Sequence, residues 1–165
     1  MTVTDLHTRR LRLHPIDAAE GARIVGRSAE PGDEWADDFP FEGDVIGVTA
    51  FLRATAVLGD QRPFGHYLIS RADDGKAIGG IGFKGQPADG CVEVGYGLAP
   101  SARGHGYAAE ALGALLTVAA EHGLSRVIAD TTGDNVASQR TLERAGFRRT
   151  RTNGDVYLYE VDLGR

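Results

Sequence analysis

The chain has 165 residues, 42% of them hydrophobic and 25% charged, so it is long enough to form one domain with a substantial core. Its net charge of −5 argues against general nucleic-acid binding, and its single cysteine excludes an internal disulfide and a cysteine-rich metal site. The five histidines lack metal-ligand spacing, and the sequence shows neither a signal peptide nor a membrane span, so we expect a cytoplasmic protein that needs no metal.

In chain order, the first part of the sequence predicts a strand, a helix, an acidic loop and a second helix. Alternation over residues 8–14 is typical of a strand, and Asp17 is a suitable cap for a helix that ends near residue 27. Residues 30–44 contain prolines, glycines, interleaved aromatic residues and seven acidic side chains without a basic one, which indicates a loop. The spacing of apolar residues predicts a helix over residues 45–58.

The second part of the sequence predicts a strand meander followed by alternating helices and strands. Three short apolar segments separated by polar turns are typical of an antiparallel meander. A long helix then starts after Gly106 and ends before Gly123, and a shorter one lies between Asn135 and Gly146. The strands predicted here span residues 65–70, 77–84, 91–98, 126–130, 147–151 and 156–161.

The stretch from Val92 to Ala120 is the most informative, because it reads as a strand, a glycine loop and a helix. Gly104 and Gly106 stand at the start of that helix, where glycine permits a tight turn and a close approach of the backbone to a ligand. The free amides and partial positive charge of a helix N-terminus suit a phosphate, with Ser101 and Arg103 beside them. An ordinary strand-to-helix turn would use the same glycines, so this motif alone decides nothing.

A dinucleotide-binding loop is the main alternative interpretation of these glycines. Gly104-x-Gly106-x-x-Ala109 matches that fingerprint, and Asp130 ends the next strand, roughly where a ribose-binding acid is expected. A doubly wound domain needs several βαβ units, however, and the sequence shows only one. A nucleotide-dependent oxidoreductase is therefore the less favoured function.

Two motifs in this order resemble the GNAT superfamily of acyl-CoA-dependent N-acetyltransferases, and within it the branch of ribosomal-protein N-terminal acetyltransferases. The family motif Gln/Arg-x-x-Gly-x-Gly/Ala is represented here by Ser101-Ala102-Arg103-Gly104-His105-Gly106. The second motif, at the spacing of this branch, runs from Asn135 to Phe147. Ser101 departs from the pattern, and Arg103 is a candidate for the missing charge. The resemblance extends from about residue 8 to residue 161.

The resemblance implies a single mixed α/β domain over residues 1–165, with a central, mostly antiparallel sheet of about seven strands and about four flanking helices. It implies transfer of an acetyl group from acetyl-CoA to a primary amine, either a protein N-terminus or a small-molecule amine, by direct attack in a ternary complex. We expect a monomer or homodimer that binds no nucleic acid and no membrane. A non-catalytic acyl-CoA-binding module on the same fold is a further alternative.

The family's coenzyme contacts transfer to the strand before the glycine loop, to the loop itself and to the start of the last helix. The backbone amide of Tyr96 or Gly97 is expected to polarise the thioester carbonyl where the family's central strands splay apart. Asn135 resembles a coenzyme contact, although a helix cap alone would explain it. The expected contacts are Tyr96, Gly97, Leu98, Arg103, Gly104, His105, Gly106, Tyr107, Ala108, Asn135 and Ser138.

Acetyl transfer requires that the amine lose a proton and that the thiolate be stabilised as it leaves. Glu93 is the candidate base, because the family often uses a glutamate on this strand; a solvent-facing or salt-bridged residue would look the same. The tyrosine that protonates the thiolate in many relatives is replaced by Leu142. Ser138, one helical turn earlier, is the candidate thiolate partner, or else bonds back to the helix end.

The acidic loop is where the family builds its acceptor site. Its carboxylates would attract a cationic amine, and its aromatic residues would line the pocket; a solvated loop whose aromatic residues plug the core is an equal alternative. The acceptor-site candidates are Trp35, Asp37, Asp38 and Phe39. His66 lies on an apolar strand and is expected to be structural rather than catalytic.

Overall fold

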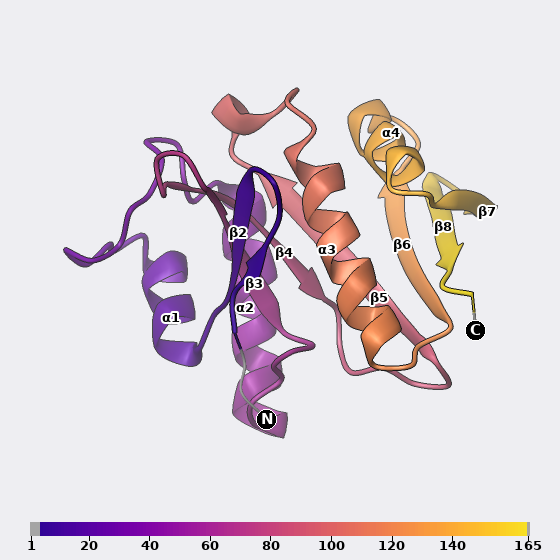
Figure 1. Cartoon of the computed structure of the whole chain (residues 1–165), viewed down its shortest axis with the longest axis horizontal. Helices are drawn as coiled ribbons and strands as arrows, with labels where there is room; N and C mark the ends of the chain where they lie inside the picture. The colour runs from indigo at the N-terminus through magenta and orange to yellow at the C-terminus, as the bar shows by residue number, and fades with distance from the viewer. Residues whose placement is uncertain (1–3, 165) are drawn as a thin grey trace.

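The computed structural model describes residues 4–164 and contains one eight-stranded sheet with the strand order β1-β2-β3-β4-β5-β6-β8-β7 (Figure 1). The strands are β1 (Leu6–His7), β2 (Leu11–Pro15), β3 (His66–Arg71), β4 (Ala77–Phe83), β5 (Cys91–Leu98), β6 (Arg126–Thr132), β7 (Arg148–Asn153) and β8 (Val156–Asp162). The helices are α1 (Ala18–Gly26), α2 (Glu42–Leu58), α3 (Tyr107–Glu121) and α4 (Val136–Arg144). Within the described residues, no helix is both long and apolar enough to cross a membrane.

The sheet is antiparallel except at one junction in its middle. Strands β3 to β5 form the predicted meander, β2 pairs antiparallel with β3, and β6, β8 and β7 form a second antiparallel group. The long helix α3 connects β5 to β6, and these two strands are parallel, as a helical crossover requires. In Figure 1, α3 crosses in front of the sheet and α2 lies behind it. The predicted mixed α/β domain with a mostly antiparallel sheet is confirmed.

Strands β5 and β6 separate soon after they meet. They pair only over Cys91–Glu93 and Arg126–Ile128. Beyond that point β5 continues along β4, and β6 continues along β8, so the two facing edges have no strand partner. This opening is the splay that the family resemblance implies, and it lies directly before the glycine loop.

Two sequence predictions need correction. The strand predicted over residues 8–14 begins later, because residues 8–10 form a turn between β1 and β2. The Thr8 amide donates to the Leu11 carbonyl at 2.9 Å, and the Leu11 amide donates to Thr8 Oγ1 at 3.1 Å. The sheet therefore has eight strands rather than about seven. The acidic loop also ends earlier than predicted, because α2 begins at Glu42 and Asp44 lies in its first turn.

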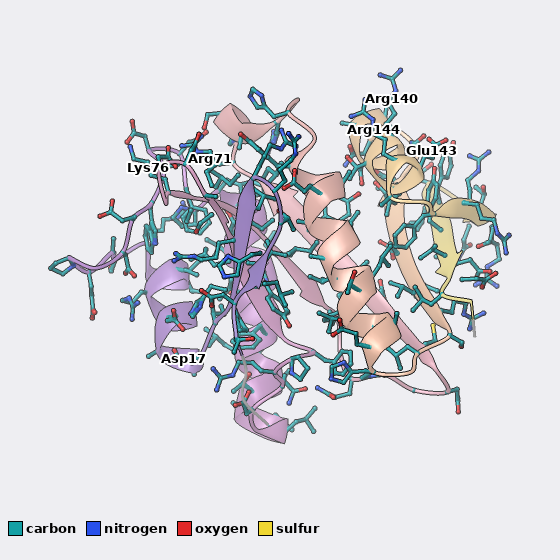
Figure 2. The ribbon with its side chains drawn as sticks, in the orientation of Figure 1. Asp17, Arg71, Lys76, Arg140, Glu143 and Arg144 are labelled. Atoms are coloured by element: carbon teal, nitrogen blue, oxygen red, sulfur yellow. The ribbon has the colours of Figure 1, made fainter. Side chains whose placement is uncertain are left out.

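The helix ends follow the local chemistry of the sequence. Asp17 accepts the Glu20 amide, and the Glu20 carboxylate accepts the Asp17 amide, which together cap α1 (Figure 2). Asn135 Oδ1 accepts the Ser138 amide at 3.1 Å and caps α4. In α2 the Asp44 carboxylate accepts the Phe41 amide at 3.0 Å. Asp44 is 3% exposed, so this capping carboxylate is buried.

Candidate active site

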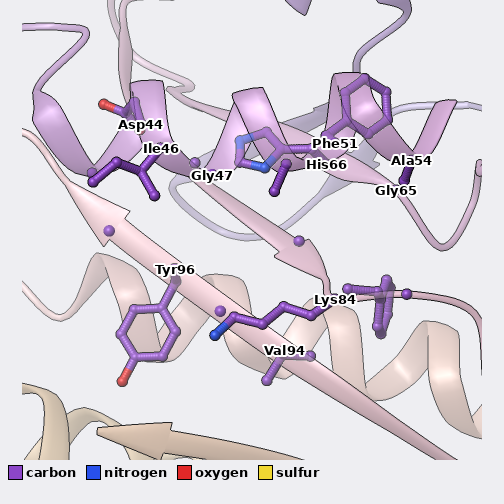
Figure 3. A pocket seen from close by; sticks show the side chains of 18 of the residues that line it. Asp44, Ile46, Gly47, Phe51, Ala54, Gly65, His66, Lys84, Val94 and Tyr96 are labelled. Carbon is purple, nitrogen blue, oxygen red and sulfur yellow. The ribbon is translucent and has the colours of Figure 1, made fainter. Parts of the chain in front are cut away.

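A cavity of about 640 Å³ lies between α2, the strands β4 and β5, and the start of α4 (Figure 3). One wall is apolar and is formed by α2 residues such as Ile46, Ala50 and Ala54. At the far end, Tyr96 and Ser138 belong to the lining, so the cavity reaches the opening between β5 and β6. The cavity thus joins the face covered by α2 to the splayed strands.

The floor of the cavity is made of glycine backbone from two adjacent strands. Gly80 pairs with Gly97, and Gly82 pairs with Gly95. A Cβ atom at Gly97 would lie 2.6 Å from the Phe41 ring, which real side chains do not tolerate. The absence of side chains lets α2 pack closely and leaves backbone exposed to a ligand.

The glycine loop presents a continuous row of free amides. Gly104 and Gly106 have positive φ angles of 83° and 80°, and Gly106 is the residue before the first turn of α3. The first helical bond is donated by Glu110 to the Gly106 carbonyl. Within the described chain, no backbone acceptor is found for the amides from Gly104 to Ala109. Such a row at a helix N-terminus is suited to a phosphate or pyrophosphate group.

Arg10 anchors this loop from the edge of the sheet, a contact that the sequence did not predict. Its Nε lies 2.7 Å from a Glu110 carboxylate oxygen, and its Nη1 donates to the His105 carbonyl at 2.9 Å. The guanidinium also stacks 4.6 Å above the centre of the Tyr107 ring. Burial alone would raise the pKa of Glu110, but hydrogen bonds from Thr8 and Arg10 outweigh it and lower that pKa.

Two polar residues predicted for different roles meet beside the loop. Asp38 accepts the Ser101 amide at 2.7 Å and the Ser101 hydroxyl at 2.8 Å, and these bonds lower its pKa. Arg103 turns back to donate to the Leu98 carbonyl at 3.0 Å. Asp38 thus braces the start of the glycine loop instead of contributing to the cavity wall.

Tyr96 and Ser138 form a hydroxyl pair at the inner end of the cavity. Their oxygens lie 2.8 Å apart, and the Tyr96 hydroxyl also donates to the Ser138 carbonyl at 3.1 Å. Burial raises the pKa of Tyr96, so its phenol is protonated at neutral pH. Sequence reasoning considered only the Tyr96 backbone. Leu142, which occupies the family's tyrosine position, is fully buried in the core.

Glu93 is the last residue of β5 that pairs with β6, and it lies outside the set of residues that line the cavity. Its carboxylate is 3.6 Å from Lys84 Nζ, and the Lys84 stem lies over Gly95 (Figure 3). The predicted base is therefore paired with a cation at the margin of the site.

The acceptor residues predicted in the acidic loop lie away from the cavity lining. Trp35 forms a bridge with Ala77, and its ring packs edge-on against Phe39, with the centroids 5.4 Å apart. Phe39 is 5% exposed and belongs to the core, whereas Asp37 is exposed to solvent. These placements match the alternative in which the aromatic residues plug the core.

Asp44 and His66 do line the cavity, although neither was predicted to. Burial raises the pKa of Asp44 to about 7, against the opposing effects of the Phe41 amide and Arg27. Burial also lowers the pKa of His66 to about 4, which keeps the imidazole neutral at pH 7. No local pattern marks these two residues, since they come together only when α2 packs against β3.

Residues 10–148 match the family model described as an acetyltransferase (GNAT) domain. Among curated proteins, the chain is 31% identical over 152 residues to YjdG of Bacillus subtilis (strain 168), described as an uncharacterized N-acetyltransferase; the match covers 86% of this chain and 88% of the relative. The fold resembles that of the acetyltransferase from Agrobacterium tumefaciens str. C58, with a TM-score of 0.68, 24% identity, and coverage of 98% and 95% of the two chains.

A further similar structure is RimL, a ribosomal L7/L12 alpha-N-protein acetyltransferase in complex with coenzyme A. Its TM-score is 0.67 at 22% identity, and the match covers 96% of this chain and 98% of that one.

Proposed function

The chain belongs to the GNAT family of N-acetyltransferases, which use acetyl-CoA, and we propose that it transfers the acetyl group to a primary amine by direct attack in a ternary complex. The observation that carries this proposal is the free amide row from Gly104 to Ala109, which lies beside a cavity that opens at the splayed strands. The pyrophosphate of the coenzyme would be held on this row, with Arg10 and Arg103 nearby.

The hydrogen-bond register of β5 supports one of the two predicted amides as the partner of the thioester. The Lys84 amide donates to the Glu93 carbonyl, and the Ala99 amide donates to the Ile78 carbonyl, so odd-numbered residues of β5 direct their polar groups toward β4. The amides of the even-numbered residues, including Tyr96 and Leu98, therefore face the opening. Of the two predicted residues, Tyr96 rather than Gly97 is suited to polarise the thioester carbonyl.

Tyr96 and Ser138 would serve the leaving group. When the amine nitrogen bonds to the carbonyl carbon, the C–S bond breaks and its electron pair moves to sulfur. A protonated phenol 2.8 Å from the Ser138 hydroxyl can supply a proton to that sulfur. Solvent then returns a proton to the phenolate, and the protons that the nitrogen gives up on forming the amide pass to a base and to solvent. Tyr96 and Ser138 would thus have the role of the tyrosine that many relatives carry at the position of Leu142.

The proposed acceptor is a primary amine, carried either by a protein or by a small molecule. A free protein N-terminus is one candidate, because RimL is an alpha-N-protein acetyltransferase of the same fold. A small-molecule amine is the other, since about 640 Å³ is sufficient for a compact ligand.

The test measures coenzyme binding and amine-dependent release of free CoA thiol. We expect acetyl-CoA, but not NAD or NADP, to raise the melting temperature, and an amine to increase thiol release. Stabilisation by a dinucleotide alone would support the oxidoreductase alternative. Binding of acetyl-CoA without thiol release for any peptide or small amine would support a non-catalytic binding module.

A further inference from the structure

The cavity contains two ionisable groups that the proposed function leaves without a role. Asp44 comes from the first turn of α2 and His66 from the start of β3, and Figure 3 shows both on the side of the cavity that α2 covers. A Cβ atom placed on Gly80 would lie 2.4 Å from His66 Nε2 and 3.3 Å from Asp44 Oδ1. The two side chains thus converge on one point of the glycine floor.

That point is next to the expected position of the thioester. Gly80 is the cross-strand partner of Gly97, and Gly97 directly follows Tyr96, whose amide faces the opening between β5 and β6. A ligand nitrogen above Gly80 would therefore approach the acetyl carbon from the side opposite the Tyr96–Ser138 hydroxyl pair.

Neither group is fully satisfied within the protein. One Asp44 oxygen accepts the Phe41 amide at 3.0 Å; for the other oxygen, and for both His66 ring nitrogens, the described part of the chain shows no hydrogen bond. Both residues line the cavity, so these polar atoms are accessible to a ligand there. A polar ligand in the cavity would supply the missing partners.

The charges around this point favour a cationic ligand. Lys84 and Glu93 pair with each other at 3.6 Å, so they leave little net charge. Tyr96 and His66 are neutral at pH 7, because burial raises the pKa of the first and lowers that of the second. Asp44 is the carboxyl group beside Gly80, whereas Asp130, which also lines the cavity, lies on β6. Arg27 and the N-terminus of α2 both favour the charged form of Asp44.

We propose that Asp44, beside His66 and above Gly80, binds the ammonium group of the acceptor and takes its proton, in the role that sequence reasoning gave to Glu93. This inference rests on the proposed acetyl transfer. One N–H bond of the ammonium breaks and an O–H bond forms on Asp44, which leaves a neutral amine to attack the thioester carbon. The His66 imidazole accepts a hydrogen bond from the amine and orients it.

The test compares Asp44→Asn with Glu93→Gln. Asparagine retains an oxygen for the Phe41 amide, so the cap of α2 is kept while the charge and the proton acceptor are lost. The probes are phenethylamine, spermidine and a hexapeptide with a free N-terminus, assayed by CoA thiol release. We expect Asp44→Asn to lower kcat/KM about 100-fold or more and to remove its acid limb near pH 7, with acetyl-CoA binding unchanged. Glu93→Gln should remain within about threefold of the wild type, a change that a lost general base would far exceed.

Retention of wild-type turnover and pH profile by Asp44→Asn would overturn the inference, as would loss of the acid limb in Glu93→Gln alone. If the wild type releases no thiol with any probe, calorimetry with CoA-loaded protein decides. Binding of a probe that weakens about tenfold in Asp44→Asn supports the amine site even though acetyl transfer fails. Equal binding by both proteins, or no binding by the wild type, overturns it.

Discussion

At the scale of single residues, burial shifts the pKa values of two neighbouring groups, Asp44 and His66, in opposite directions. The pKa of Asp44 is raised to about 7, so the native state keeps a proton that the unfolded chain loses near pH 4. Below pH 4 both states are protonated, and the native state has no disadvantage. As the pH rises from 4 to 7, the free energy of unfolding falls, and above pH 7 this loss of stability reaches its full size. For His66, with a lowered pKa of about 4, stability instead falls as the pH drops from about 6.5 to 4.

The first prediction follows from that linkage. Asp44→Asn should be more stable than the wild type at pH 8, by at most about 4 kcal/mol, and the difference should disappear near pH 4. Urea unfolding at pH 4, 6 and 8 measures it. A stability difference that stays constant across this range would mean that Asp44 ionises normally in the folded protein.

The second prediction concerns the hydroxyl pair. Tyr96→Phe and Ser138→Ala should each lower kcat about 10-fold or more while leaving the KM for acetyl-CoA nearly unchanged, because each removes part of the proton path to sulfur. The double variant should be little worse than the poorer single variant, since the two groups act together. Additive losses in kcat would show that they act separately.

At the scale of elements, the turn between β1 and β2 supports the glycine loop at long range. Arg10 joins the Glu110 carboxylate in α3 to the His105 carbonyl, so the edge of the sheet fixes the first turn of the helix. The loop's shape therefore depends on a segment almost a hundred residues earlier in the chain.

The third prediction tests this support. Arg10→Ala should weaken CoA binding by about five- to tenfold, in keeping with the loss of a charged hydrogen-bonded pair, and should leave kcat at saturation largely unchanged. Arg12→Ala, two residues later in β2, is the matched control, because Arg12 is more exposed and has only a 3.7 Å contact with Asp5. Similar binding by both variants would exclude a special role for Arg10.

Arg140 and Arg144, on α4, point outward from the domain (Figure 2).

The elements that the sequence predicted well are those with local signals. The helix caps Asp17 and Asn135 and the glycine loop are marked by residue type and spacing, and the structure contains the corresponding helix ends. The turn at residues 8–10, where the sequence predicted a strand, was missed, because Thr8 and Arg10 in that turn bind the distant Glu110 in α3. The convergence of Asp44 and His66 was missed for the same reason: it is produced by packing between distant segments.

At the scale of the whole molecule, the order of elements was sufficient to predict the fold, but not where the cavity would lie. The acidic loop carried the strongest charge signal in the sequence, yet Trp35 and Phe39 pack into the domain and Asp38 braces Ser101. The cavity instead lies under α2, whose apolar side chains gave no indication of chemistry.

The separation of β5 from β6 has a consequence for amide hydrogen exchange. Along β5, the amides of Gly95 and Gly97 are directed at β4, whereas those of Tyr96 and Leu98 face an edge without a strand partner. Exchange along this strand should therefore alternate, with Tyr96 and Leu98 fast and the two glycines slow, as nuclear magnetic resonance would measure residue by residue. Addition of CoA should slow the two fast amides most, and the alternation should then fade.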